Sequence, residues 1–220
     1  MGKQTIDNFQ KGILADIADT KQGFATGDNN RFLRFWQEVE WYKVGLNYGT
    51  RKEAEESSKK WFPANKGGSY RRWYGNNTYL ANWENNGSEM RAFRGSVIRN
   101  PQYYFRQGIT WSSLSSGNLS MRFSPKGFIF ESKGSMCYFK DDNDLLYVLA
   151  LMNTKVVDSM LSILAPTLDY HEGPMSRVPV VIDVNQKEAV DEIAKECVDN
   201  CKSDWDSFET SWDFKRHPLV

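Results

Sequence analysis

Apolar residues recur at helical spacing in three stretches of the chain. Residues from about Ile6 to Ala18 carry apolar side chains three to four positions apart, which predicts a helix with one apolar face. The stretch from Asp144 to Leu164 predicts the most apolar helix, capped by Asp142 or Asn143 and ended before Pro166. The central helix is expected to pack against the core.

The third stretch, from Gln186 to about Trp212, predicts a long helix. Its apolar residues step by three or four positions, and they are Val190, Ala194, Cys197, Cys201, Trp205, Phe208 and Trp212. A stripe of this length is more than a free helix would show. We therefore expect this helix to pack on the domain or on another subunit.

Short strands are predicted between these helices. Leu119 to Phe123 alternates between apolar and polar residues, and Gly127 to Phe130 and Met136 to Phe139 are apolar runs bounded by Pro, Lys and Gly. Arg31 to Trp41 is rich in aromatic residues and predicts a further strand, as does Val178 to Val184. The short spacing between the first three predicts tight turns.

Two stretches show no clear period. Lys43 to Lys60 is polar and predicts either a surface helix or a loop, whereas Trp61 to Gly87 predicts an ordered loop with short elements. Together the pattern predicts an α+β fold with a curved mixed or antiparallel sheet, a packed central helix and a long C-terminal helix. We expect a helical lead-in at residues 1–20, a central domain at 21–184 and a C-terminal helical segment at 185–220.

Composition adds few restrictions. The chain has 220 residues, of which 40% are hydrophobic and 25% charged, which is typical of one large globular domain or two small ones. Three cysteines are too few for a disulfide scaffold, so we expect a reducing, cytoplasmic compartment. The apolar run from Leu145 to Leu164 is broken by Asn153, Lys155 and Asp158, which favours a buried helix over a membrane span.

Charge is distributed unevenly. The formal net charge is zero, with 28 basic and 28 acidic residues, but Ser57 to Phe130 contains 11 Lys and Arg against only Glu84 and Glu89. The same segment holds 15 of the 31 Phe, Trp and Tyr residues. Nucleic acids are bound mainly by neutralising their phosphates, and aromatic rings can stack on bases. The segment therefore predicts a nucleic-acid-binding surface, although we expect about half of its aromatic side chains to be core.

Three motifs in the chain resemble a known family. Gln22 to Phe32 (QGFATGDNNRF) resembles the G-x-x-T-G-x-N-x-x-F opening of TaqI-like DNA target-recognition domains. Leu149 to Lys155 (LALMNTK) is similar to their L-A-L-L-N-S-K helix, and Met175 to Val180 (MSRVPV) to their closing I-x-x-I-P-V strand. The resemblance implies that residues 21–184 form a target-recognition domain.

A closer resemblance is to the C-terminal region of BREX phage-defence adenine methyltransferases of the PglX type and of fused restriction–modification enzymes. It rests on strings of rare residues: Trp61 to Gly68, Arg72 to Asn77, Asn82 to Asn85, Tyr104 to Ser112 and Trp205 to Phe214. The resemblance implies a specificity module for duplex DNA. It also implies that S-adenosylmethionine binds a catalytic domain elsewhere in the parent protein, and that this domain and other defence proteins are partners.

The candidate DNA contacts are chosen by residue type. Expected phosphate contacts are Lys59, Lys60, Lys66, Arg71 and Arg72. Expected base readers are Arg99, Arg106, Arg122 and Lys133, because Arg can bond bidentately to guanine, with Asn76, Asn77 and Asn118 for adenine. Tyr74 or Trp111 is expected to stack or wedge at a distorted base step.

Catalytic motifs are weak. Asn100-Pro101-Gln102-Tyr103 imitates the Asn-Pro-Pro-Tyr motif that holds a flipped adenine, but it has Gln in place of Pro and no cofactor-type Gly turn before it. Glu131 to Lys133 resembles the end of a nuclease signature without an acidic partner at ordinary spacing. Cys197 and Cys201 have few histidines with which to bind zinc. We expect no catalytic residue, cofactor or metal in this segment.

The sequence therefore predicts a sequence-specific duplex-DNA recognition module of an N6-adenine methyltransferase. Two alternatives remain open. One is a protein-interaction module of a phage-defence complex, in which the charge separation serves a protein partner. The other is a small autonomous DNA-modifying enzyme.

Overall fold

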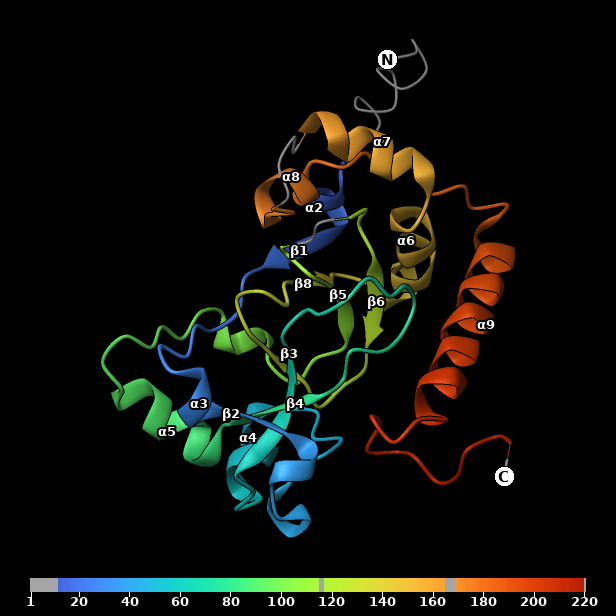
Figure 1. Cartoon of the computed structure of the whole chain (residues 1–220). Coiled ribbons are helices and arrows are strands. Elements are labelled where there is room, and N and C mark those ends of the chain that lie inside the picture. The colour runs from blue at the N-terminus through green and yellow to red at the C-terminus, as the bar shows by residue number, and fades with distance from the viewer. Residues whose placement is uncertain (1–11, 115–116, 165–168, 220) are drawn as a thin grey trace.

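Two four-stranded sheets form the centre of the computed structural model, which describes residues 12–114, 117–164 and 169–219 (Figure 1). The first sheet contains β1 (Ala18–Lys21), β8 (Met136–Phe139), β5 (Gly108–Trp111) and β6 (Met121–Ser124), in that order. Every neighbouring pair in it is antiparallel. Its hydrogen bonds thus join the start of the chain to residues more than 110 positions away.

The second sheet has the order β2 (Leu33–Phe35), β4 (Tyr79–Asn82), β3 (Trp61–Asn65) and β7 (Ile129–Phe130). β3 is antiparallel to β4 and parallel to β7, so this sheet is mixed. All five residues of β3 are buried, as expected of a strand covered on both faces.

The two sheets share a core through β8. Cys137 and Phe139 face a cluster that includes Ile109 of β5 and the helices, whereas Met136 and Tyr138 face a second cluster with the aromatic residues of the other sheet. Because successive strand residues point to opposite faces, one apolar strand serves both cores. The molecule therefore has three layers: helices, the first sheet and the second sheet (Figure 1).

Helices cover the outer face of the first sheet. They are α2 (Leu14–Ile17), α6 (Leu145–Met152), α7 (Lys155–Leu164), α8 (Glu172–Ser176) and the 20-residue α9 (Lys187–Asp206). α9 packs on α6, through Val198 and Trp205 among others (Figure 1).

Shorter helices accompany the second sheet and the connections. They are α3 (Asn29–Phe32), α4 (Arg51–Glu56) and α5 (Glu84–Ala92), with 3₁₀ turns at Trp36–Glu38, Trp41–Lys43, Pro101–Tyr103 and Asp142–Asp144. The predicted α+β class, with a packed central helix and a long C-terminal helix, is confirmed. The strand predicted at Met136 to Phe139 has the observed bounds.

The helix predicted from Asp144 to Leu164 is instead two helices. α6 ends at Met152, α7 begins at Lys155, and the two are bent by 82°. The amide of Asn153 explains the break, because its Oδ1 accepts from the Met121 N–H at 3.0 Å and its Nδ2 donates to the Met121 carbonyl at 3.1 Å. Neither Asp142 nor Asn143 caps α6, and Pro166 lies outside the described residues.

One predicted strand is shorter than expected, and another does not form. Only Leu33–Phe35 of the predicted Arg31–Trp41 strand is a strand, because Asp28 caps α3 before it and Glu38 bonds the Phe35 N–H after it. Val178–Val184 makes isolated backbone hydrogen bonds to the segment around Ile13 and does not form a strand.

The two predicted helices at the chain ends also differ from the prediction within the described residues. α9 stops at Asp206, where the Ser211 hydroxyl bonds the Asp206 carboxylate and turns the chain. Residues 6–11 of the helix predicted from about Ile6 to Ala18 lie outside the described residues, and the described part forms only the single turn Leu14–Ile17.

No single helix in the described ranges combines the length and the apolar composition of a membrane span. The bent pair of Asp142–Met152 and Lys155–Leu164 reaches the length and apolar composition of a span only when the two helices are counted together.

Candidate nucleic-acid interface

Residues 22–27 run between two other segments and bring separate parts of the chain together. The backbone of Phe24 bonds Phe130 and Ser132 on one side, at 3.0 and 2.8 Å, while Ala25 exchanges two 2.8 Å hydrogen bonds with Val97 on the other. The Asn100 amide adds a bond to the Gln22 carbonyl at 2.9 Å. Segments 94–100 and 130–133 therefore flank residues 22–27, which lead into the turn Thr26–Asn29, called here the TGDN turn after its sequence.

Basic side chains gather along these three segments and beside them. We call the following set the basic strip: Arg34, Lys66, Arg94, Arg99, Arg106 and Lys133. Within the described ranges, no carboxylate lies within 4 Å of the side-chain nitrogens of these six residues. Cations that are not in close contact with a carboxylate can neutralise a phosphate backbone and release its counterions.

The TGDN turn is stabilised by hydrogen bonds from its own side chains. Thr26 Oγ1 donates to Asn29 Oδ1 at 2.6 Å, and the Asp28 carboxylate accepts from the Arg31 N–H at 3.1 Å. Gly27 has φ +70°, and a Cβ there would lie 2.7 Å from the Gly95 backbone. Glycine is therefore required at this position.

A cavity of about 360 Å³ opens beside this turn. Its lining consists of Asn29, Asn30, Leu33, Arg34, Phe35, Glu38, Lys66 and Tyr79. Phe35 is 45% exposed and stacks on Tyr79, with ring centroids 4.8 Å apart and planes at 30°. The Lys66 ammonium lies 5.1 Å from the Tyr79 centroid, and burial lowers its pKa despite the nearby Glu131 carboxylate.

Arg106 is the member of the basic strip that lies beside Tyr103 and the end of β8. It is exposed, and its guanidinium carbon lies 5.5 Å from the ring centroids of both Tyr103 and Tyr138. Tyr103 donates to the Asp19 carboxylate at 2.9 Å. Burial raises the pKa of Asp19, but hydrogen bonds from Tyr103 and Lys21 outweigh it and lower the pKa overall.

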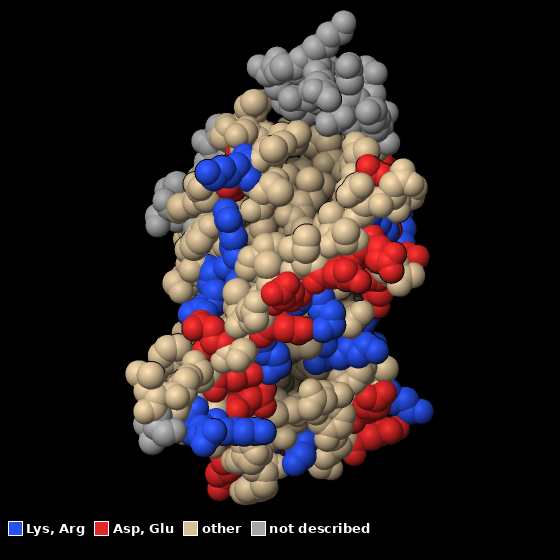
Figure 2. Space-filling model, turned by 90° about the vertical axis from the view of Figure 1, so that its right-hand side faces the viewer, with Lys and Arg blue, Asp and Glu red and all other residues tan. Residues whose placement is uncertain are grey.

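The side of the molecule that carries α9 has a different charge pattern. Figure 2 shows Asp and Glu in bands that alternate with Lys and Arg there. Along α9, Lys187 pairs with Asp191 at 2.6 Å and Lys195 with Asp199 at 2.5 Å. Three Lys stand against seven Asp and Glu along α9, so this side is net negative and offers little to a polyanion.

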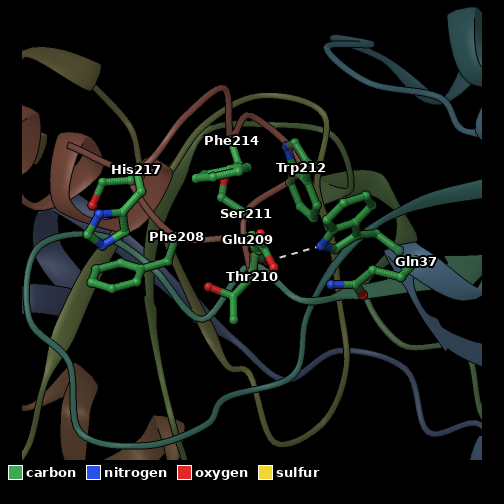
Figure 3. Close-up of a pocket in the computed structure, with 10 residues that line it drawn as sticks. Gln37, Phe208, Glu209, Thr210, Ser211, Trp212, Phe214 and His217 are labelled. Carbon is green, nitrogen blue, oxygen red and sulfur yellow. Dashed lines mark hydrogen bonds between the residues drawn. The ribbon is translucent and has the colours of Figure 1, made fainter. Parts of the chain in front are cut away.

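A larger cavity of about 790 Å³ lies between the C-terminal segment and the Trp36 turn (Figure 3). Its apolar wall includes Trp36, Phe208, Trp212 and Phe214, and the Trp36 indole donates to the Thr210 carbonyl at 3.0 Å. These contacts anchor the end of the chain beside the second sheet.

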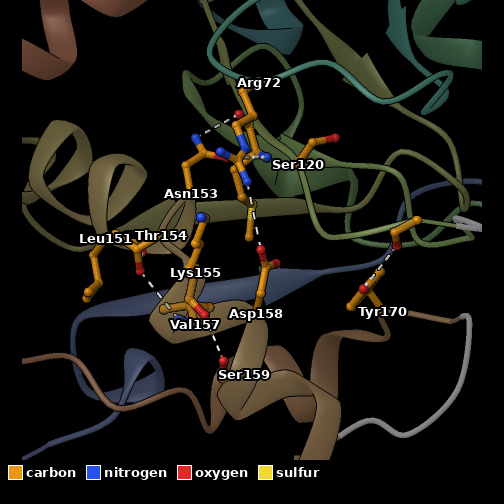
Figure 4. A network of polar contacts seen from close by, with 12 residues as sticks. Arg72, Ser120, Leu151, Asn153, Thr154, Lys155, Val157, Asp158, Ser159 and Tyr170 are labelled. Carbon is orange, nitrogen blue, oxygen red and sulfur yellow. Dashed lines mark hydrogen bonds and ion pairs between the residues drawn. The ribbon is translucent and has the colours of Figure 1, made fainter.

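The predicted phosphate contacts divide into two groups. Lys66 belongs to the basic strip, whereas Arg71 pairs with Asp204 of α9 at 3.1 Å and Arg72 with Asp158 of α7 at 3.8 Å (Figure 4). Lys60 pairs with Glu84 at 3.7 Å, and Lys59 donates to the Tyr42 carbonyl. Both arginines join the 70–74 loop to helices, which is a structural role that the charge count alone did not indicate.

Four other predicted DNA contacts are buried, which corrects the sequence-based selection. Trp111 is 0% exposed and donates its indole N–H to the Tyr170 carbonyl at 2.7 Å, and Arg122 is 1% exposed. Tyr74 and Asn77 are each 5% exposed. Side chains with so little accessible surface offer little for DNA to contact in this conformation.

The remaining predicted base readers are accessible. Arg99, Arg106 and Lys133 lie on the basic strip, and Asn118 is exposed. Asn76 is partly exposed, but its amide donates to the Ser69 carbonyl at 2.9 Å.

The strip and its cavity also contain residues that sequence reasoning missed, namely Arg34 and Arg94, together with the aromatic Phe35. Arg94 lies in the acid-poor segment, so its position there was a usable signal. Arg34 and Phe35 lie outside that segment, and only the fold brings them to the strip.

Two of the three weak catalytic motifs make structural hydrogen bonds, and the cysteine pair has no further metal-binding side chains grouped with it in the described residues. Asn100 has φ +51° and its amide bonds Gln22, while the Glu131 carboxylate accepts from the Ser132 hydroxyl and the Lys133 N–H at 2.8 and 2.7 Å. Among the residues that the structure describes, no group of three or more His, Cys, Asp or Glu side chains is placed to hold a metal ion.

Comparison with known proteins gives two relatives over nearly the whole chain, and no model of a protein family matches. The chain is 36% identical over 214 residues to the adenine-specific methyltransferase PglX of Lacticaseibacillus casei (strain Zhang), which covers 94% of the chain and 18% of the relative. It is 35% identical over 217 residues to the adenine-specific methyltransferase BrxX of Escherichia coli O9:H4 (strain HS), covering 98% and 17%. The chain thus spans less than a fifth of these relatives and is similar to a partial region of each.

Proposed function

We propose that this chain is the part of a site-specific N6-adenine DNA methyltransferase that recognises the target sequence in duplex DNA. Methyl transfer from S-adenosylmethionine would occur in another part of the same protein. The two relatives are named as adenine-specific methyltransferases, and this chain corresponds to only a small part of each, which supports an assignment to one module rather than to the whole activity.

One observation supports DNA recognition best: cations from separate segments, none with a carboxylate within 4 Å in the described ranges, lie on both sides of a single turn. Arg99 and Arg94 come from one flank, Lys133 from the other, and Lys66 and Arg34 from the adjoining sheet. We propose that the strip faces DNA and that Arg99, Arg106 and Lys133 supply phosphate or base contacts.

The α9 side favours a second, complementary role. Acidic residues outnumber basic ones along α9 by seven to three, and its exposed surface includes Ile193, which is 62% exposed. We propose that this side contacts protein, either the remainder of the methyltransferase or another component of a defence system.

A segment exchange tests the main proposal. Residues 12–219 would replace the matching region of the Lacticaseibacillus casei relative, and methylated adenines would be mapped across a genome by single-molecule sequencing. We expect the exchanged protein to methylate the sequence of the protein that donated the segment. Methylation at the recipient's original sequence would contradict the proposal and favour a protein-interaction module.

A second experiment concerns autonomy. The chain alone, given labelled S-adenosylmethionine and DNA, is expected to transfer no methyl group. Transfer by the isolated chain would instead support a small enzyme.

A further inference from the structure

The cavity beside the TGDN turn has the parts of a nucleotide site. One aromatic ring, Phe35, is 45% exposed and is backed by Tyr79 on its other side. Base–aromatic stacking needs an accessible ring held in a fixed plane, and the Tyr79 stack fixes that plane. A volume of about 360 Å³ is near the lower end of small-ligand pockets, so it suits one nucleotide rather than a duplex.

Two cations border the same cavity. Arg34 is held by bonds from Nη1 to the carbonyls of Asn30 and Leu33, the latter at 2.8 Å. In the described part of the chain, no hydrogen bond engages its Nη2. Lys66 is partly desolvated over Tyr79, and an anion would compensate that loss of hydration.

Glu38 is the one acidic residue among the described residues of the cavity lining, and its carboxylate is engaged by the backbone beside Phe35. A Glu38 oxygen accepts from the Phe35 N–H at 2.8 Å, so this carboxylate holds the backbone that carries the ring. Asn30 is exposed at the rim, and an amide of this kind can bond the edge of adenine.

We propose that this cavity takes one unstacked nucleotide of the target DNA, with its base on Phe35 and its phosphate at Lys66 and Arg34. The inference rests on the proposed function and adds a position at which the DNA is distorted. Aromatic side chains that engage an unstacked base are a known way to read a site through its deformability.

The test uses the full-length protein and a duplex that contains its mapped methylation site. Phe35→Ala is expected to weaken binding about 5- to 150-fold, which corresponds to the loss of one stacked base. Phe35→Leu keeps apolar contact with Tyr79 but lacks the ring, and it should lose most of the same affinity. Phe35→Tyr should bind like the wild type. Tyr42→Ala is the matched control, because Tyr42 is 66% exposed and lies outside the cavity lining.

A fluorescent base analogue placed at each position of the site in turn reports unstacking. We expect one position, besides the adenine that is methylated, to brighten when the wild type binds and to stay dim with Phe35→Ala. If the wild type binds its site but Phe35→Ala and Phe35→Leu bind equally well, and no second position brightens, the nucleotide site is wrong and the proposed function stands. If the wild type does not bind the duplex at all, both are wrong.

Discussion

At the scale of single residues, burial decides what a basic side chain does. Arg122 has the residue type of a base reader, yet its guanidinium donates to the carbonyls of Arg71 at 3.2 Å and Ser120 at 3.4 Å. Burial lowers its pKa to about 10, and the neighbouring Arg71 charge adds to that effect. Sequence alone could not separate Arg122 from Arg99 or Arg106, because all three lie near predicted strands in the same acid-poor segment.

Arg122 gives a stability prediction. Arg122→Met removes a buried charge that has no acidic partner but leaves the Arg71 and Ser120 carbonyls without their donor, so it should cost about 1–3 kcal/mol in the free energy of unfolding. Arg122→Ala also leaves a cavity and should cost about 2–4 kcal/mol. Urea denaturation measures both. A loss of DNA affinity in Arg122→Met without a loss of stability would show that Arg122 becomes exposed on binding.

Glu89 gives a pH prediction. Its pKa is lowered mainly by hydrogen bonding to Arg31, whose Nε and Nη2 lie 2.8 and 2.7 Å from Oε1, and Asn82 donates to Oε2. A lowered folded-state pKa means that this contribution to stability is present above the unfolded pKa of 4.5 and is lost as the pH falls through the folded value. Glu89→Gln should therefore destabilise the fold at pH 7 but not at strongly acidic pH.

The expected size is small because the Glu89 side chain is 41% exposed and solvent screens the pair, so about 1 kcal/mol is the upper limit. Thermal unfolding across a pH series from neutral to strongly acidic measures the difference between variant and wild type. Glu56→Gln is the control, since its pair with Lys52 is more exposed and longer, at 3.8 Å. A difference that grows on acidification would contradict the assignment.

At the scale of elements, local patterns predicted what local contacts determine. β8 was predicted with its observed bounds because four apolar residues between turn signals suffice to define a buried strand. The break between α6 and α7 was missed because it depends on Met121, 32 residues away in the sequence. The Arg31–Trp41 strand was overextended for a related reason: bonds from Asp28 and Glu38 compete with strand geometry at both of its ends.

Asn153 gives a prediction at this scale. It is 6% exposed and makes two hydrogen bonds to the Met121 backbone, in the manner of an additional strand beside β6. Asn153→Ala would leave a buried N–H and a buried carbonyl unpaired, at a cost of about 2–4 kcal/mol in the free energy of unfolding. Ser159→Ala on α7 is the control and should stay within about 0.5 kcal/mol, because that hydroxyl is exposed. Equal stability of the two variants would rule out this account of the bend.

At the scale of the whole molecule, folding redistributes the charge separation seen in the sequence. Arg71 and Arg72 from the basic segment meet Asp204 and Asp158 from the acidic remainder, so part of the excess is neutralised internally. Of the bases left over in that segment, Lys66, Arg94, Arg99 and Arg106 belong to the basic strip. Composition could indicate that a basic surface exists, but only the pairing of distant segments indicates where it lies.

The salt dependence of DNA binding gives the corresponding prediction. Replacing Arg99 or Lys133 by Ala in the full-length protein should reduce the slope of log affinity against log salt by about 0.9 for each phosphate that the variant no longer neutralises. Lys52→Ala, at an exposed position on α4, should leave the slope unchanged. Fluorescence anisotropy across a salt series measures the slopes. If the slopes of the Arg99→Ala and Lys133→Ala variants equal that of the wild type, the basic strip does not contact DNA phosphates.

The pairing of β1 with β8 has a consequence for synthesis of the chain. Ala18 pairs with Phe139 and Lys21 with Met136, so the edge strand has no partner until the ribosome has added more than 110 further residues. At about 5–20 residues per second, that wait lasts roughly 6 to 24 seconds. Nascent chains that stall before Met136 should therefore expose an unpaired edge and be the species that chaperones hold.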